Sequence, residues 1–351
     1  MAVEDGQRTA SRQRPQARAA CASRADAALA FAGETRNPRI IVTLSGSRGM
    51  KLKFHTLDVF TERRSCGNPL AVVLGADGLS SGQMQTIARE FNLAETIFVM
   101  APADRANTAR VRIFTPAAEI PFAGHPTIGC AILLAELVKG EDRPFDIDIR
   151  FEEMAGLVPV RVRTNGGATW AQFTAPVVPF PVVADLPPVG SVASALGLEP
   201  SDICPAGEAL GLHEGGPRFF YVPVTSRAAL ARARAREPAW SVILGTLGAV
   251  GGYLYARGGD HPDTTYRTRM LNPAGEGPED PATGSAAALL ASQLHQTSRL
   301  DDGVHEIRLE QGYEMGRPSD LWLEVDAAGG RIVAVRVAGR AVRVMEGHLS
   351  P

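Results

Sequence analysis

Two stretches of this chain repeat one arrangement of polar, proline and glycine residues. The first runs Glu119-Ile-Pro-Phe-Ala-Gly-His125-Pro-Thr-Ile-Gly129-Cys-Ala131, and the second runs Glu276-Gly-Pro-Glu-Asp280-Pro-Ala-Thr-Gly284-Ser-Ala286. Aligned on their prolines and glycines, the copies place His125 opposite Asp280 and Cys130 opposite Ser285. Upstream, Arg112-Ile-Phe-Thr-Pro116 matches Arg269-Met-Leu-Asn-Pro273, two residues out of phase. Different polar residues at matching positions of a duplicated half predict one site shared between two similar lobes.

Each copy carries the signal of a helix start. Asp is a preferred N-cap and Pro at the first helical position loses no hydrogen bond, so Asp280-Pro281 predicts a capped helix. His125-Pro126 has the same pattern with a less usual cap. Because small residues follow each proline, open backbone N–H groups at both starts can hold an anion such as a carboxylate. The alternative is that both residues only cap their helices, and the matched copies favour the shared site.

The helices that follow are apolar almost all round. Residues 128–137 carry one charge and residues 286–294 carry none, and a helix of this kind is buried. Short predicted strands flank each one. The pattern therefore predicts an α+β protein in which a curved sheet wraps a central helix, built twice. Ser80 predicts the cap of one further helix, residues 82–91.

The strand pattern divides the chain into two lobes joined by a Pro-rich bridge, residues 175–188. The first lobe, residues 50–175, has predicted strands at 54–61, 70–74, 95–100, 109–115, 145–151, 158–163 and 168–174. The second lobe, residues 189–340, has predicted strands at 218–224, 251–256, 264–271, 306–311, 321–325 and 332–337. A last predicted strand, 341–345, can return to the first lobe.

Residues 1–49 differ in composition from the rest of the chain. They hold eight Arg, no Lys and four acids, a local charge of +4, without sustained apolar periodicity. We interpret them as a disordered extension or an upstream mis-start, because Met50 opens the first convincing strand; an Arg-rich transit peptide is the alternative. The total charge is −2, so the remaining residues carry −6. That balance argues against a nucleic-acid-binding protein.

Composition and spacing exclude several other classes. No apolar run reaches transmembrane length, so we expect no membrane partner. Cys21, Cys66, Cys130 and Cys204 lack the spacing of a disulfide framework or a zinc site, which predicts a cytoplasmic protein without a metal. The glycine-rich segment 245–252 lacks the G-x-G-x-x-G spacing and leads into a strand-like sequence. Nucleotide binding is therefore not expected.

Glu95 is a candidate acid/base. It opens the predicted strand 95–100 and, by alternation, shares a face with Ile97 and Val99. A carboxyl on an apolar face is desolvated, which raises its pKa toward neutrality, where one group both takes and returns a proton efficiently. The alternative is an ordinary carboxylate in water at the end of a strand.

Six segments, in order, carry a family resemblance. They are Leu57-Asp-Val-Phe-Thr61, Gly67-Asn-Pro-Leu-Ala-Val-Val73, Ala94-Glu-Thr-Ile-Phe98, Arg112-Ile-Phe-Thr-Pro-Ala-Ala-Glu-Ile-Pro-Phe-Ala-Gly-His-Pro-Thr127, Glu279-Asp-Pro-Ala-Thr-Gly-Ser-Ala286 and Gln311-Gly-Tyr-Glu-Met-Gly-Arg-Pro-Ser319. From about residue 51 to its C-terminus the chain resembles the PhzF-like phenazine-biosynthesis family. The resemblance implies the diaminopimelate-epimerase-like fold: two pseudo-symmetric lobes, each a barrel around a central helix, with the site in the cleft.

The same resemblance implies an activity and residue roles. It implies a homodimeric isomerase without a cofactor, which moves a proton along a small diene acid as the founding member does with trans-2,3-dihydro-3-hydroxyanthranilate. Glu95 would shuttle the proton, while His125 and Asp280 would lie across the cleft and hold or polarise the substrate. The implied substrate-binding residues are Gly124, Thr127, Thr283, Gly284 and Ser285. The family pattern has no counterpart of residues 1–49.

Two other functions remain open. The first is a racemase or epimerase of the same fold, a chemistry that related families perform with two opposed thiols. The alignment of the two copies puts no thiol at either helix start, which argues against it. The second is a small-molecule-binding protein without catalysis, and the presence of Glu95, His125 and Asp280 together argues against that because binding alone needs no positioned base.

Overall fold

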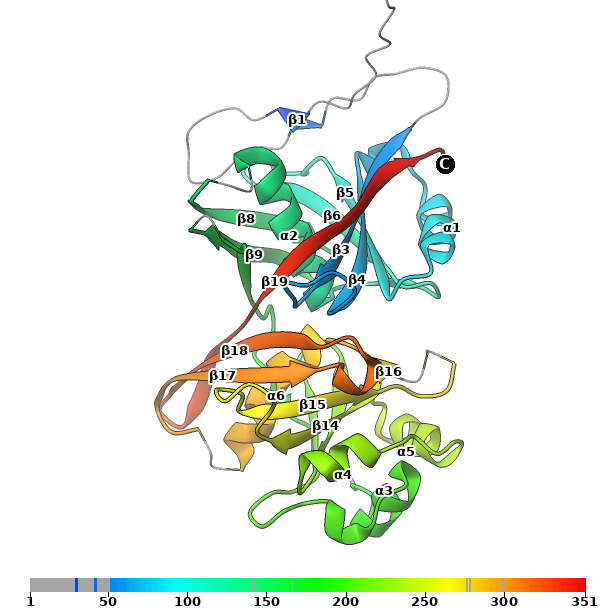
Figure 1. Ribbon diagram of the computed structural model, residues 1–351, viewed down its shortest axis with the longest axis vertical. Helices are drawn as coiled ribbons and strands as arrows, with labels where there is room; N and C mark the ends of the chain where they lie inside the picture. The colour runs from blue at the N-terminus through cyan, green and yellow to red at the C-terminus, as the bar shows by residue number, and fades with distance from the viewer. Residues whose placement is uncertain are drawn as a thin grey trace, which may run out of the picture.

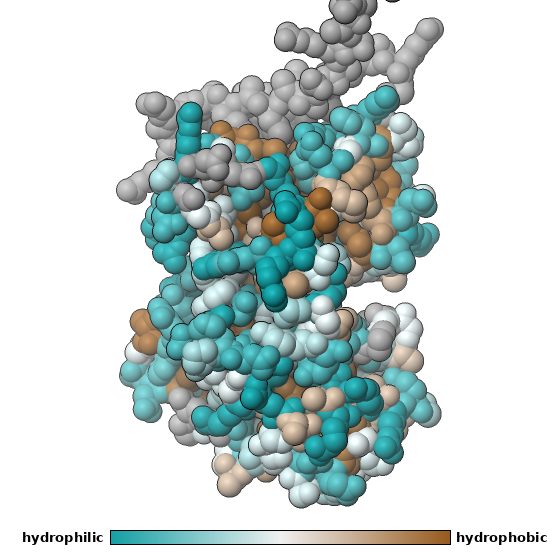
Figure 2. All heavy atoms as spheres, viewed as in Figure 1, coloured by the Kyte–Doolittle hydropathy of each residue, from teal (hydrophilic) through white to brown (hydrophobic). Residues whose placement is uncertain are grey.

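The computed structural model describes residues 29–30, 41–42, 51–140, 143–165, 167–275, 277, 279–297 and 300–351. The protein is α+β and consists of two pseudo-symmetric lobes, each with a curved sheet around one central helix (Figure 1). The molecule narrows where the lobes meet (Figure 2). Most of the sequence-predicted extension, residues 1–49, lies outside the described residues. The four described residues within it pair as β1 (Leu29–Ala30) and β2 (Ile41–Val42).

The first lobe is a ring of paired strands around helix α2 (Gly124–Lys139). Neighbouring strands in the ring are β3 (Leu52–Val59), β4 (Asn68–Leu74), β5 (Glu95–Met100), β6 (Ala109–Phe114), β8 (Phe145–Glu153), β9 (Gly156–Thr164), β10 (Trp170–Thr174) and the end of β19 (Arg331–Leu349). The first twelve residues of α2 are buried, as its apolar sequence predicts. Helix α1 (Ser81–Phe91) covers the outside and is capped by Ser80, as predicted.

The second lobe repeats this order around helix α6 (Gly284–Gln296), with ten buried residues. Its strands are β11 (Phe180–Pro181), β12 (Gly211–Glu214), β13 (Arg218–Pro223), β14 (Gly251–Arg257), β15 (Tyr266–Leu271), β17 (Gly303–Gln311), β18 (Ser319–Ala328) and the start of β19. Helices α3 (Val189–Leu196), α4 (Arg227–Arg232) and α5 (Ala239–Leu247) pack outside it around Trp240 (Figure 1). The sequence pattern predicted none of these three helices.

Strand β19 connects the lobes. Two separate strands were predicted here, and the structure has one continuous strand that pairs with β18 in the second lobe and with β3 in the first. The predicted break fell at Gly339, a residue that usually interrupts a strand. Here a Cβ on Gly339 would lie 2.2 Å from Cδ1 of Phe60, so the glycine makes room for a buried aromatic ring. Phe60 itself has a left-handed backbone, with φ of 63°.

The true register of the internal repeat differs from the predicted one. Short strands β7 (Glu119–Ile120) and β16 (Glu279–Asp280) pair with β6 and β15 respectively, and an Arg–Glu ion pair joins each couple. Ile120 therefore corresponds to Asp280, and His125 corresponds to Ser285. The predicted match of His125 with Asp280 was wrong. The connection before β16, residues 272–278, is longer than residues 115–118 before β7, which shifts the alignment.

Candidate active site

The two central helices meet at their N-termini. A Cβ on Gly124 would lie 3.1 Å from Cα of Gly284, and one on Gly284 would lie 3.3 Å from Cα of Gly124. Only glycine at both positions lets the backbones approach this closely. The N-caps are Ala123 and Thr283, and neither side chain accepts a capping hydrogen bond. The prediction that His125 and Asp280 cap the helices was therefore wrong.

This junction is a suitable place for a carboxylate. The first backbone amides bonded within the helices are those of Thr127 and Ala287, so the N–H groups that precede them have no partner inside the helix. The positive ends of both helix dipoles converge at the same point. Facing amides from the two lobes thus have the arrangement with which helix starts bind anions.

Glu95 and His125 lie side by side at this junction. Oε2 of Glu95 and Nε2 of His125 are 3.2 Å apart, from β5 and the first turn of α2. Neither atom has an aligned hydrogen-bond partner among the described residues. These two buried polar atoms lie close together but form no hydrogen bond with each other. Both can therefore form a hydrogen bond with a ligand. Since 18% of the Glu95 side chain reaches solvent, the site is accessible.

The environment favours the uncharged form of both groups at neutral pH. Burial, together with the nearby charge of Asp280, raises the pKa of Glu95 to about 8. Burial lowers the pKa of His125 to about 3, although a hydrogen bond to the Pro69 backbone opposes that change. The pKa rise expected from the apolar face of Glu95 is therefore present, because Ile97 and Val99 on that face belong to the core.

Asp280 enters the site from the second lobe and is held by hydrogen bonds from three neighbouring side chains. Its carboxyl accepts from the amide of Asn68 at 2.8 Å and from the hydroxyl of Thr283 at 2.5 Å. Gln311 donates to the Asp280 carbonyl at 2.8 Å and to the Thr283 hydroxyl at 3.0 Å. Burial raises the pKa of Asp280, and the bonds from Thr283 and Asn68 oppose that rise.

The remaining predicted site residues fall into two groups. Gly124, Gly284 and the partly exposed Ser285 lie at the junction of the helices. Thr127 is fully buried, and its hydroxyl is bonded to the Ala123 carbonyl and to Glu153 at 2.9 Å. The hydroxyl of Thr127 is thus used in hydrogen bonds within the first lobe. The hydroxyl of Thr283 is used in the hydrogen bonds around Asp280 described above.

Asn68 and Gln311 were not predicted as site residues. Both stand inside segments that carried the family resemblance, so a signal was present. Asn68 follows Gly67 at the start of β4, where a Cβ on Gly67 would lie 2.2 Å from the Val59 carbonyl oxygen and φ is +64°. The fixed turn at Gly67 directs Asn68 toward the second lobe.

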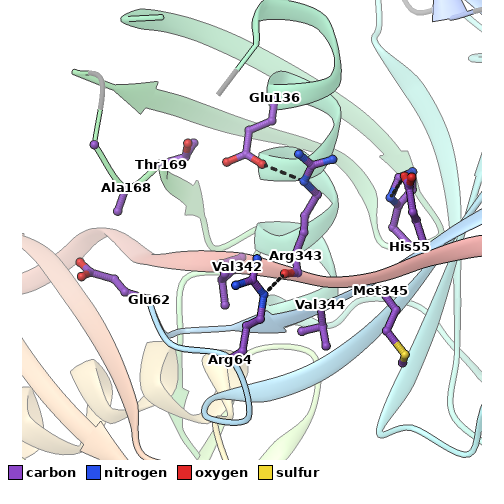
Figure 3. Close-up of a pocket in the computed structure, with 13 residues that line it drawn as sticks. His55, Glu62, Arg64, Glu136, Ala168, Thr169, Val342, Arg343, Val344 and Met345 are labelled. Carbon is purple, nitrogen blue, oxygen red and sulfur yellow. Dashed lines mark hydrogen bonds and ion pairs between the residues drawn. The ribbon is translucent and has the colours of Figure 1, made fainter. Parts of the chain in front are cut away.

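A separate polar cavity of about 480 Å³ lies along the first-lobe end of β19 (Figure 3). It is lined by His55, Glu62, Arg64, Glu136, residues 167–169 and residues 341–346. None of the predicted site residues lines it. In the described part of the chain, no three His, Cys, Asp or Glu side chains converge as a metal site requires, and no helix there is long and apolar enough to span a membrane.

Residues 57–347 match the model of the family described as phenazine biosynthesis-like protein. The chain belongs to this family. It is 39% identical, over 83% of its length and 96% of the relative's, to an uncharacterized isomerase of Mesorhizobium japonicum. It is 36% identical to a trans-2,3-dihydro-3-hydroxyanthranilate isomerase of Pseudomonas aeruginosa, over 84% of this chain and 98% of that protein. The protein is an isomerase.

The fold also matches solved structures. A Bacillus anthracis PhzF-family phenazine biosynthesis protein aligns with a TM-score of 0.76 at 24% identity, covering 86% of this chain and all of that one. That likeness shows the fold. In the register of the structure, His125 and Ser285 occupy the two facing helix starts, so neither start carries the thiol that the epimerase alternative requires.

Proposed function

We propose that this isomerase moves a proton within a small unsaturated carboxylic acid, without a cofactor. The substrate carboxylate binds the facing amides of α2 and α6, with Ser285 beside it. Glu95 takes a proton from a substrate carbon as the electrons of that C–H bond shift a double bond along the molecule. The same carboxyl then returns the proton to another carbon, so that no proton or electron is lost.

The pair formed by Glu95 and His125 is the observation that carries this proposal. A carboxyl with a pKa of about 8 exists in both protonation states near neutrality, which suits a group that must accept and donate. Neutral His125 and the carboxyl group of Asp280 flank it and can polarise the substrate as charge develops. A protein that only bound its ligand would need no carboxyl with such a raised pKa.

The test is turnover of trans-2,3-dihydro-3-hydroxyanthranilate, the compound in the name of the Pseudomonas aeruginosa relative, in D₂O. The amide in Glu95→Gln keeps the shape of the side chain and cannot carry the proton, so the rate should fall roughly 10²–10⁴-fold. Glu153→Gln is the matched control, because the pKa of Glu153 is also raised to about 8 and its side chain bonds Thr127. A Glu95→Gln rate within about threefold of wild type would remove Glu95 from the mechanism.

The proposal extends to location and assembly. We place the protein in the cytoplasm, since Cys66, Cys130 and Cys204 are free thiols of the kind that persist in a reducing compartment. The family resemblance supports a homodimer acting on a small molecule. Light scattering that gave the 37.2 kDa mass of a single chain would refute the dimer.

A further inference from the structure

Asn68 joins the two lobes at the site. Its side chain is fully buried, and its amide nitrogen donates to the Asp280 carboxyl at 2.8 Å and to the Ala282 carbonyl at 3.0 Å. The backbone carbonyl of its neighbour Pro69 accepts a hydrogen bond from His125. The next residue, Leu70, pairs with Glu95 in the parallel ladder between β4 and β5. Three consecutive residues of the first lobe are therefore bonded to, or paired in the sheet with, the three candidate catalytic residues.

The orientation of the Asn68 amide is fixed by chemistry. A backbone carbonyl can only accept a hydrogen bond, so the group that faces Ala282 must be the NH₂ and not the oxygen. The oxygen consequently points away from Ala282 and Asp280. That atom, Oδ1, is buried and has no hydrogen-bond partner among the described residues.

A buried acceptor without a hydrogen-bond partner is unfavourable, which indicates that a ligand supplies the missing donor. Such an atom has lost its bonds to water and has gained no hydrogen bond in the protein. Oε2 of Glu95 and Nε2 of His125 are in the same condition. All three unpaired atoms belong to residues grouped around the start of β4. A ligand that bound at the junction and presented a suitable donor would satisfy the Asn68 oxygen.

We propose that Asn68 is a specificity-determining residue whose side-chain oxygen accepts a hydrogen bond from an N–H or O–H group of the substrate. The inference rests on the proposed function and narrows it. The substrate class becomes small unsaturated carboxylic acids that carry an amino or hydroxyl group within reach of Asn68. An acid without such a donor would leave the oxygen buried and unpaired, and would bind more weakly.

Calorimetric titration with four aromatic probes tests this inference. The first probe, 3-hydroxyanthranilate, carries both an amino and a hydroxyl donor. Anthranilate carries only the amine, 3-hydroxybenzoate carries only the hydroxyl, and benzoate carries neither. Wild type should bind 3-hydroxyanthranilate roughly 10-fold to 100-fold more tightly than benzoate, the range that an unpaired acceptor implies. The two single-donor probes show whether the amine or the hydroxyl is recognised.

Asn68→Ala should reduce that preference to within about threefold, because no acceptor remains to be satisfied. Gln311→Ala is the matched control, since Gln311 also holds Asp280 and does not present the unpaired oxygen. This variant should bind all four probes more weakly, by a similar factor, and should keep the preference for 3-hydroxyanthranilate over benzoate. If Asn68→Ala does not fold, Asn68→Val replaces it, because valine suits a strand position and its side chain also offers no acceptor.

Three results would overturn the inference. They are equal or absent binding of the probes by wild type, a preference that survives in Asn68→Ala, and a preference lost equally in Gln311→Ala. The proposed function fails in a different way. If the preference for donors depends on Asn68 but wild type exchanges no deuterium into any substrate, recognition stands and the isomerase mechanism does not.

Discussion

At the residue scale, the site depends on how three titratable groups share a buried space. Glu95 comes from the first lobe and Asp280 from the second, and the charge of Asp280 raises the cost of ionising Glu95. In the pseudo-symmetric register the counterpart of Asp280 is Ile120, which has no carboxyl group. A symmetric scaffold thus carries an asymmetric site, in which each lobe contributes a carboxyl at a different position.

The stability of the protein should report the buried state of Glu95. Its pKa is about 8 in the folded protein and 4.5 when unperturbed. Between those values the folded state keeps a proton that the unfolded state releases, so stability falls as pH rises from about 4.5 to about 8 and then levels off. A glutamine side chain in place of Glu95 cannot ionise, so it removes this contribution.

The melting temperature of Glu95→Gln should therefore increase relative to that of wild type as the pH rises from about 4.5 to about 8. At pH 4 the variant should show no such increase. Thermal melts from pH 4 to pH 9 measure the difference. Glu153→Gln should show the same trend, because burial also raises the pKa of Glu153 to about 8. A Glu95→Gln difference that does not change with pH would show that Glu95 ionises normally.

Sequence alone could identify some of these residues and not others. Alternation along β5 predicts the apolar face beneath Glu95, because that relation is local. Asn68 lies 212 residues from Asp280 and is a neutral amide, so neither spacing nor charge marks it. The roles of His125 and Asp280 came from the family resemblance, whereas their contacts required the fold.

At the element scale, the central helices were predicted and their starts were not. The apolar sequences of α2 and α6 identify buried helices whatever their ends. Their starts depend on the contact between Gly124 and Gly284, which no local capping signal encodes. Helices α3, α4 and α5 have only 8, 6 and 9 residues, so they show too few turns for a periodic pattern.

The continuity of β19 should depend on the fit between Gly339 and Phe60. Gly339→Ala places a Cβ 2.2 Å from the Phe60 ring, which should cost roughly 1–3 kcal/mol of unfolding free energy through overpacking. Combining it with Phe60→Leu should recover part of that loss, since the smaller side chain makes room. Urea unfolding of wild type, both single variants and the double variant gives the coupling free energy between positions 339 and 60.

Gly245→Ala is the control for that cycle. A Cβ at Gly245 meets nothing within 4 Å, and the residue lies inside helix α5, where Ala is favoured over Gly by about 1 kcal/mol. This variant should be neutral or more stable. Additive effects of Gly339→Ala and Phe60→Leu would show that the two residues do not constrain each other.

At the scale of the whole molecule, the site requires both lobes in register. Besides β19, Arg317 of the second lobe bonds the first-lobe segment that precedes Asn68. Its guanidinium donates to the Gly67 and Cys66 carbonyls at 2.7 and 2.8 Å and pairs with Asp58 at 2.5 Å. The position of Asn68, and through it Asp280, is thereby linked to the packing of one lobe on the other.

Arg317→Gln should consequently impair both stability and catalysis. Only 6% of the Asp58 side chain is exposed, so removal of its partner leaves a buried charge and should cost about 3–5 kcal/mol of unfolding free energy. Loss of the bonds to Gly67 and Cys66 frees the turn that positions Asn68, and kcat/KM should fall about tenfold, a change of about 1.4 kcal/mol in transition-state binding. Urea unfolding and steady-state kinetics measure the two effects.

The double variant Asp58→Asn/Arg317→Gln separates those effects. It removes the unpaired charge, so much of the stability should return, since a neutral pair carries no such desolvation cost. The turn at Gly67 would still lack its guanidinium donor, so kcat/KM should stay low. Recovery of kcat/KM together with stability would instead show that Arg317 acts only by stabilising the fold. A low kcat/KM in a stable protein would place the control of the site in the contact between the lobes.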